Sequence, residues 1–140
     1  MEQLEKVDLG VSTMTYKVLV VDDSKLARMA VAKAFNTVEP SWPRVEASNA
    51  AEALALAQAS GFDIALLDFN MPERDGLHLA ADLKAVNPDA VLAVISANHQ
   101  KEIVDRAHAI GAAFLPKPLT EQALRDFLGN AEAKLKAHKR

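Results

Sequence analysis

Short apolar runs alternate along this chain with longer stretches whose apolar residues recur at helical spacing. Each run is rich in Val, Ile, Leu, Ala or Phe and is too short for a buried helix, so it predicts a strand buried on both faces. A weaker run alternates polar and apolar residues, which is typical of an edge strand. The buried strands are predicted at Val18–Val21, Ile64–Leu67, Ala90–Ile95 and Ala112–Leu115, and the edge strand at Arg44–Ala47.

Helices are predicted in the segments that follow the strands. Ser24 is a candidate N-cap for the first helix, whose apolar residues repeat as far as Val38. Residues 50–60 are rich in alanine and stop before Gly61, a residue type that favours the end of a helix. Further helices are predicted over residues 76–86, over about 100–110, and after Thr120, a second candidate N-cap.

The alternation of five strands with five helices indicates the fold class. It predicts an α/β fold, a doubly wound five-stranded parallel sheet with helices on both faces. Residues 1–15 precede the first strand without a clear pattern, and we expect them to form an N-terminal arm that is loose or partly helical. Residues 16–140 contain no linker or repeat and are predicted to be one domain.

The composition is ordinary for a globular domain, and it argues against several classes of function. The chain has 140 residues, 50% hydrophobic and 25% charged, with a net charge of −3, which argues against nucleic-acid binding through a basic surface. The lack of cysteine excludes disulfides, thiolate metal ligands and a cysteine nucleophile. No apolar run approaches the roughly 20 residues of a membrane span, and no signal peptide is evident. We therefore expect a cytoplasmic protein with no membrane partner.

Reactive side chains follow the strands at their carboxyl ends. In a parallel α/β sheet these ends share one edge, and ligands bind in the crevice there. Asp22 and Asp23 follow the first strand, and Asp68 follows the third. Ser96 follows the fourth strand and Lys117 the fifth. Each of these residues alone would suit a helix cap, a turn or the surface, but their coincidence at one predicted edge favours a functional site.

Three carboxylates at one edge need a counter-charge. Two like charges about 4 Å apart repel by roughly 4 kcal/mol at an effective dielectric near 20. Oxygen ligands without thiols favour a hard divalent cation, Mg²⁺ first. A metal beside a lysine and a hydroxyl suits a phosphoryl group, because all three can bind its oxygens. One carboxylate can then act as a nucleophile and become an acyl phosphate.

The same residues lie in motifs that resemble a known family. The motifs are VLVVDDS, LLDFNMPERDGL, VISAN and IGAAFLPKP, and they agree with the family in identity, order and spacing. From about Tyr16 to Leu135 the chain resembles the receiver domain of two-component response regulators, most closely the single-domain, CheY-like type. The resemblance implies a flavodoxin-like sheet with strand order 2-1-3-4-5.

The resemblance also implies a role for each acidic residue. Asp68 corresponds to the phosphoacceptor of the family, and Asp23 to a direct ligand of Mg²⁺. Asp22 would support the metal through water or through Lys117. The backbone carbonyl of Asn70 would add a further ligand to the ion.

The remaining family positions concern the phosphoryl group and the switch. Ser96 and Lys117 would hold the phosphoryl oxygens, and a cis peptide bond before Pro118 would aim the lysine at the pocket. Phe114 corresponds to the switch aromatic, which turns inward when the hydroxyl residue moves to the phosphate. Ser96 replaces the threonine of many members, and Phe114 lacks the phenol of a tyrosine switch. The lost methyl predicts a looser coupling of Ser96 to Phe114, and without the phenol the hydrogen bond that reports the active state cannot form.

The function implied is that of a stand-alone response regulator. The chain would accept a phosphoryl group on Asp68 from a histidine kinase or a histidine phosphotransfer protein, with Mg²⁺ bound. We expect no further domain after residue 140, and we therefore expect the output to be a change in protein binding, through a face formed by residues 97–128. The chain would then not be an enzyme, beyond catalysing its own phosphorylation and dephosphorylation.

Two other functions fit parts of the site. A metal-dependent phosphatase can also use an Asp nucleophile, but that chemistry usually needs a second acid two residues later, where this chain has Asn70. A scaffold module that never turns over phosphate is the other alternative. The presence of all five reactive residues at the strand ends argues against it.

Overall fold

A five-stranded parallel sheet forms the centre of the molecule in the computed structural model, which describes residues 14–71 and 75–138. The strand order is β2-β1-β3-β4-β5, as the family resemblance implies. The polar–apolar strand β2 lies at one edge of the sheet, also as predicted. The strands are β1 (Val18–Val21), β2 (Arg44–Ala47), β3 (Ile64–Asp68), β4 (Val91–Ser96) and β5 (Ala112–Pro116).

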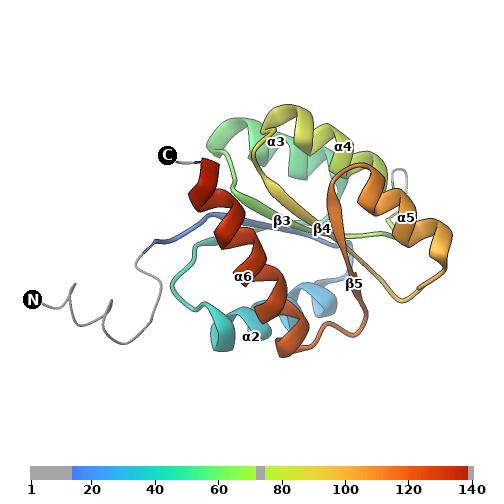
Figure 1. Cartoon of the computed structure of the whole chain (residues 1–140), viewed down its shortest axis with the longest axis horizontal. Helices are drawn as coiled ribbons and strands as arrows, with labels where there is room; N and C mark the ends of the chain where they lie inside the picture. Colours follow the sequence, from blue (N-terminus) through green and yellow to red (C-terminus); the bar gives the residue numbers. More distant parts are fainter. Residues whose placement is uncertain (1–13, 72–74, 139–140) are drawn as a thin grey trace, which may run out of the picture.

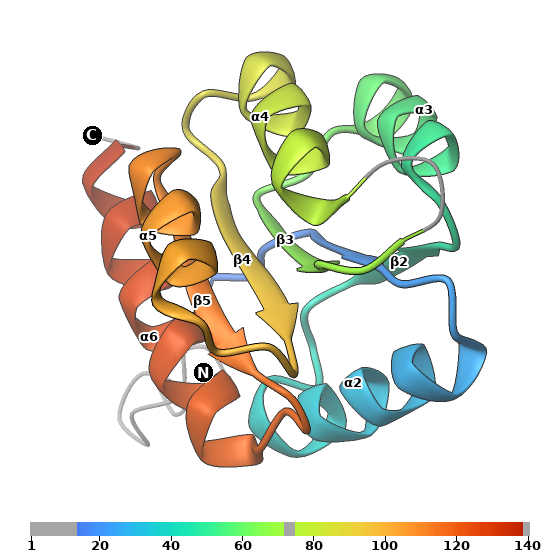
Figure 2. The ribbon, with the colours of Figure 1, turned by 90° about the vertical axis from the view of Figure 1, so that its right-hand side faces the viewer.

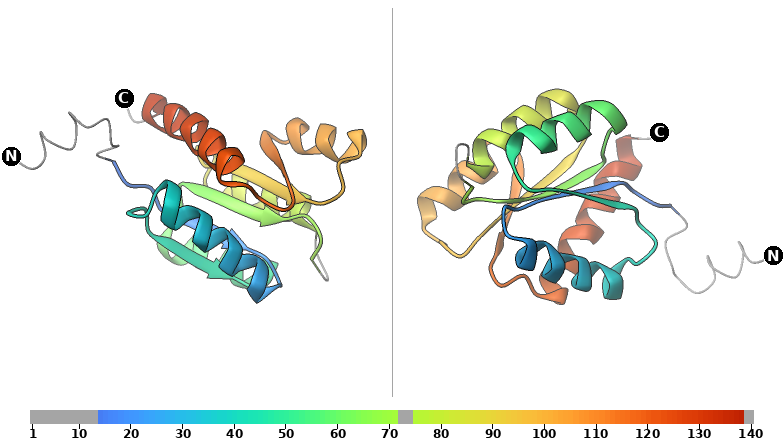
Figure 3. Two further views of the ribbon diagram at one scale, coloured as in Figure 1. Left: turned by 90° about the horizontal axis from the view of Figure 1, so that it is seen from below. Right: turned by 180° about the vertical axis from the view of Figure 1, so that it is seen from behind.

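Helices cover both faces of this sheet (Figures 1 and 3). α2 and α6 pack against one face and against each other, whereas α3, α4 and α5 cover the opposite face. The helices are α2 (Lys25–Val38), α3 (Ala50–Ser60), α4 (Gly76–Val86), α5 (Lys101–Ala109) and α6 (Glu121–His138). None of the helices in the described part of the chain has the length and apolar character needed to cross a bilayer.

The apolar runs of the strands supply two hydrophobic cores at once. Successive side chains of a strand point to opposite faces, so Val18 and Val20 join the core beneath α2 and α6. Leu19 and Val21 of the same strand join the core beneath the other three helices. This two-sided burial explains why the central strands read as unbroken apolar runs, in contrast to the alternating β2.

Side-chain caps fix where the helices begin. The hydroxyl of Ser24 accepts a hydrogen bond from the backbone N–H of Ala27, and that of Thr120 accepts one from Ala123, so both predicted caps are confirmed. Asn49 caps α3 and Asp75 caps α4 in the same way. The glycine predicted to end α3, Gly61, has a φ of 74°, which few other residue types adopt readily.

The chain is anchored just before β1 by aromatic packing. Trp42 is buried, and its indole N–H donates to the carbonyl of Met14 at 3.1 Å. Its ring meets the edge of the Tyr16 ring, with the centroids 5.0 Å apart. Trp42 therefore packs its loop against the start of the domain. The predicted arm over residues 1–15 lies almost wholly outside the described residues.

Two helical glycines provide a matched test of how tightly the loop after β3 is packed. A Cβ at Gly76 would lie 2.5 Å from the carbonyl oxygen of Asp68 and 3.0 Å from the Cα of Phe69, both backbone atoms. A Cβ at Gly129 in α6 would meet nothing within 4 Å. Gly76→Ala should therefore lower the free energy of unfolding by about 1–3 kcal/mol. Gly129→Ala should raise it by about 0.5–1 kcal/mol.

Urea denaturation of the two variants and the wild type measures both changes. Because alanine is the better helix former at each position, propensity alone would stabilise both variants. Equal stabilisation of the two would contradict the close approach of Gly76 to the backbone of Asp68.

Candidate functional site

The carboxyl ends of the strands meet at one edge of the sheet, where Figure 2 shows the arrowheads of β3 and β4 side by side. β3 is central and pairs with β1 on one side and β4 on the other. The structure extends β3 and β4 by one residue beyond the predicted ends, so Asp68 and Ser96 are the last residues of their strands. The sheet itself therefore fixes the backbone of both residues.

Three carboxylates converge at this edge, as the sequence predicts. One carboxylate oxygen each from Asp22, Asp23 and Asp68 lies within 4.8 Å of the other two. Asp22 and Asp68 are each only 5% exposed, whereas Asp23 is exposed. Two of the three acids are thus buried, and the third is exposed to solvent.

Lys117, which directly follows the edge strand β5, brings a positive charge to the two buried acids. Its Nζ lies 2.9 Å from Oδ1 of Asp68 and 3.4 Å from Oδ2 of Asp22. Its backbone N–H donates to the carbonyl of Ser96 at 3.0 Å, which ties the loop after β5 to the end of β4. The peptide bond between Lys117 and Pro118 is cis, as predicted.

Burial and neighbouring charge shift the pKa of both partners in this ion pair. Burial raises the pKa of Asp68 above its ordinary value, and the charge of Asp22 raises it further. The hydrogen bonds from Lys117 and from the backbone N–H of Asn70 act in the opposite direction without reversing the shift. For Lys117, burial lowers the pKa, but the hydrogen bond and charge of Asp68, followed by those of Asp22, raise it overall.

The three acids form a donor set suited to a hard divalent cation. Carboxylate oxygens are the ligands that Mg²⁺ prefers, and three of them are already close enough to share one ion. Lys117 supplies a single positive charge to the buried pair, which leaves the cluster with a net negative charge. The residues present therefore fit a magnesium site held by Asp22, Asp23 and Asp68. The part predicted for the Asn70 carbonyl stays a prediction.

Ser96 and Phe114 lie on the two strands that continue the sheet beyond Asp68. Ser96 is 1% exposed, and its Oγ accepts a hydrogen bond from the backbone N–H of Asn98 at 3.0 Å. Phe114 lies opposite Val94 of β4 and is partly buried. The ring of His99 packs edge-on against Phe114, with centroids 5.8 Å apart and an interplanar angle of 82°.

Some residues around the site escape prediction from the sequence. His99 is one of them, because nothing in the spacing of the sequence pairs it with Phe114. Leu26 and Met29 are 77% and 55% exposed on α2, directly after the acidic pair. The sequence contains one indication of this exposure: neither residue belongs to the stripe of apolar residues that α2 buries. Arg28 was also missed, because its partners are the backbone carbonyl of Asp22 and a glutamate on β2.

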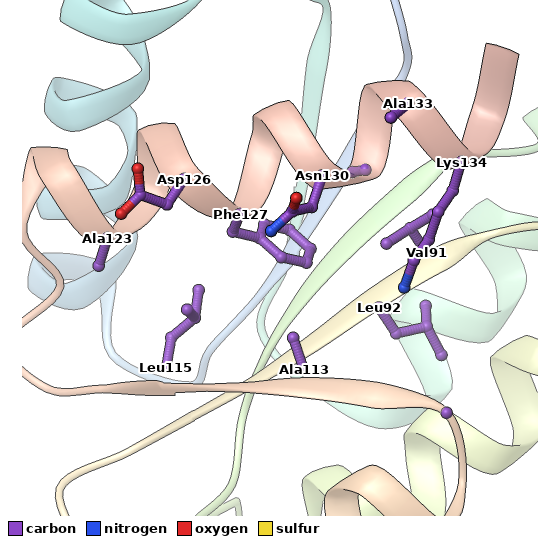
Figure 4. A pocket seen from close by; sticks show the side chains of 12 residues that line it. Val91, Leu92, Ala113, Leu115, Ala123, Asp126, Phe127, Asn130, Ala133 and Lys134 are labelled. Carbon is purple, nitrogen blue, oxygen red and sulfur yellow. The ribbon is translucent and has the colours of Figure 1, made fainter.

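A cavity of about 630 Å³ lies apart from this site, between α6 and the strands β4 and β5 (Figure 4). Leu115 and Phe127 form part of its apolar wall, and Asp126 and Lys134 are its charged residues. None of the acidic residues of the crevice lines it. The cavity therefore has no direct part in the chemistry at the strand ends.

The raised pKa of Asp68 predicts how stability changes with pH. Because the folded state binds the Asp68 proton more tightly than the unfolded state, the ionised carboxylate costs stability above the folded pKa. This cost disappears as the pH falls through that pKa towards the ordinary value. In metal-free buffer, Asp68→Asn should therefore stabilise the protein at neutral pH, by an amount that shrinks on acidification.

Thermal unfolding in EDTA at a series of pH values tests this expectation. Asp126→Asn, at an exposed position of α6, is the control and should change little. A variant less stable than the wild type at neutral pH would mean that the bond to Lys117 outweighs burial and repulsion.

Comparisons with known proteins agree with this geometry. The family model of the response regulator receiver domain matches residues 18–128. The transcriptional regulatory protein PdtaR of Mycobacterium tuberculosis is 35% identical over 106 residues, which cover 74% of this chain and 50% of that protein. A putative transcriptional regulator of Pseudomonas aeruginosa is 36% identical over 97 residues, 69% of this chain and 46% of its own length. The chain thus spans about half the length of these curated relatives.

A solved structure extends the similarity to three dimensions. The chemotaxis protein CheY4 of Vibrio cholerae superposes with a TM-score of 0.75 at 26% identity, over 84% of this chain and 99% of that one. The family model covers well over half of the chain, and the fold, strand order and acidic crevice agree with it. This chain therefore belongs to the response regulator receiver domain family, the receiver domains of two-component response regulators.

Proposed function

We propose that this chain accepts a phosphoryl group on Asp68 from a phosphohistidine, with Mg²⁺ bound, and that phosphorylation changes which proteins it binds. The observation that carries the proposal is the position of Asp68. It is a buried carboxylate at the end of the central strand, 2.9 Å from Lys117 and within one acidic cluster with Asp22 and Asp23. Receiver domains interact with histidine kinases or phosphotransfer proteins and with downstream targets, and membership of the family supports the same classes of partner here.

The residues of the crevice suit each part of this transfer. An oxygen of Asp68 forms a bond to phosphorus as the bond from phosphorus to the donor histidine nitrogen breaks, which leaves an acyl phosphate on the aspartate. Lys117 is close enough to Asp68 to hold an oxygen of the incoming group. A bound Mg²⁺, held by the three acids and the Asn70 carbonyl, would neutralise further phosphoryl charge. The chemistry we propose is limited to the chain's own phosphorylation and dephosphorylation.

The surface beside the crevice suits contact with a protein donor. α2 begins two residues after Asp23, and its first turns expose the apolar side chains of Leu26 and Met29. Apolar side chains that a helix exposes to solvent often mark a protein–protein interface. A phosphohistidine on a partner helix could approach Asp68 while that partner covers these two residues.

The output would pass from Ser96 to the face formed by residues 97–128. The hydroxyl of Ser96 accepts a hydrogen bond from Asn98, and the next residue, His99, packs on Phe114. A Ser96 hydroxyl that turns to a phosphoryl oxygen would disturb this loop and free space for Phe114. Such an element has two packed arrangements, and one new charge-assisted hydrogen bond can bias it. The stand-alone arrangement and the cytoplasmic location stay predictions.

Labelling of Asp68 tests the proposal directly. Incubation with Mg²⁺ and acetyl phosphate should add one phosphoryl group per chain, detected by intact mass, and EDTA should prevent the addition. Asp68→Asn should remove it, because the amide is a far weaker nucleophile. Asp126→Asn, on α6, is the matched control and should be labelled like the wild type.

Other outcomes separate the alternative functions. Sustained release of phosphate from many esters would favour a phosphatase, and a folded chain that takes no label would favour a scaffold. Label retained by Asp68→Asn would place the acceptor elsewhere and contradict the proposal.

The proposed switch predicts where the molecule responds. Addition of beryllofluoride, a phosphoryl mimic, with Mg²⁺ should change backbone amide shifts around Asp68 and across residues 97–128. In Phe114→Ala the changes around Asp68 should remain, while those across residues 97–128 should become smaller. Phe114→Tyr keeps an aromatic ring and should preserve the wild-type pattern. Equal responses of the wild type and Phe114→Ala over residues 97–128 would show that Phe114 does not transmit the change.

A further inference from the structure

Arg28 connects the acidic crevice to the edge of the sheet. It lies one turn into α2, and its side chain is only 15% exposed. Its Nη1 donates to the backbone carbonyl of Asp22 at 2.6 Å, and its Nε pairs with Oε1 of Glu46, on β2, at 2.9 Å. One guanidinium therefore bridges the peptide group between Asp22 and Asp23 to the neighbouring strand.

This contact completes a set of bonds around Asp22. The N–H of Asp22 donates to the carbonyl of Ala47 at 3.1 Å, and its Oδ1 accepts from the N–H of Ser24 at 2.9 Å. Asp22 is thus bonded through its N–H, its carboxylate and its carbonyl, and the carbonyl that Arg28 holds belongs to the peptide that leads into Asp23. Asp23 is exposed, so its backbone rather than burial must set the direction of its carboxylate.

We propose that Arg28 is a positioning residue for the metal: it fixes the Asp22–Asp23 peptide so that the carboxylate of Asp23 points towards Asp68. This inference rests on the proposed function, because it concerns the Mg²⁺ site of the same crevice. It adds a residue that touches neither the metal nor the phosphoryl group and acts through the backbone of two ligands.

The sign of the charge makes the proposal testable. A cation this near a divalent metal opposes its binding, so Coulomb's law alone predicts tighter Mg²⁺ binding when Arg28 is removed. Glu46, paired with Arg28, offsets part of this repulsion. A positioning role predicts the opposite result, because a loosened Asp22–Asp23 peptide must be ordered again on binding.

The planar fork of arginine explains why a lysine would not serve as well. A guanidinium donates in two directions at once, here to the Asp22 carbonyl and to Glu46. An ammonium on a flexible stem keeps the charge but lacks this fixed geometry. Arg28→Lys therefore separates geometry from charge, and Lys25→Ala removes a charge from an exposed neighbour on the same helix.

Mg²⁺ titrations of the full chain at constant ionic strength, followed by the amide signals of Asp23 and Asp68, give the test. Arg28→Ala should weaken Mg²⁺ binding by about 10-fold or more, as is typical when a group that orients metal ligands is lost. Arg28→Lys should also weaken it, whereas Lys25→Ala should leave it unchanged or tighter. Without metal, the ¹⁵N order parameters of Asp23 and Ser24 should fall in both Arg28 variants.

Each contrary result has a distinct meaning. Binding by Arg28→Ala as tight as or tighter than the wild type, with Arg28→Lys like the wild type, would overturn the role of Arg28 alone. A wild type that binds no Mg²⁺ would overturn the proposed metal site together with this role. If Arg28→Ala does not fold, Arg28→Lys decides, because it keeps the charge and most of the side-chain packing.

Discussion

Repulsion among like charges at the end of the central strand constrains the rest of this structure. A parallel sheet delivers the carboxyl ends of its strands to one edge, and here that edge holds three carboxylate oxygens within 4.8 Å of one another. Two of the acids are buried, so water screens them poorly. Lys117 offsets part of the repulsion, but it lies directly after β5, the last strand of the sheet. The acids and their counter-charge therefore come together only when β1, β3 and β5 are all folded into the sheet.

The sequence predicts those parts of the site that depend on the course of the chain alone. The apolar runs locate the strands, and the residues directly after them identify Asp22, Asp23, Asp68, Ser96 and Lys117. Arg28 could not be found in the same way, because its partners are a backbone carbonyl and a glutamate on another strand. On a helix, such an arginine has the pattern of an ordinary solvated residue. His99 was missed for a related reason, since only the tertiary fold brings its ring to Phe114.

The residues that we propose for the chemistry and for the output lie on adjoining strands. Asp68 ends β3, Ser96 ends β4 and Phe114 lies on β5, so two neighbouring strands separate the acid from the proposed partner face. The loop after β4 contacts both strands, through the hydrogen bond from Asn98 to Ser96 and through the packing of the His99 ring on Phe114. Close packing favours a few discrete arrangements over continuous deformation. This layout supports a switch in which a small movement of one hydroxyl changes the surface beyond it.

A crystal structure of the chain with Mg²⁺ and beryllofluoride tests the central claim most directly. The account predicts beryllofluoride on the carboxylate of Asp68, within hydrogen-bonding distance of Lys117 and the Ser96 hydroxyl. It predicts one Mg²⁺ beside it, with ligand oxygens from Asp23 and Asp68 at about 2.0–2.1 Å. Beryllofluoride bound at another residue, or an ion held without Asp23 and Asp68, would contradict the account.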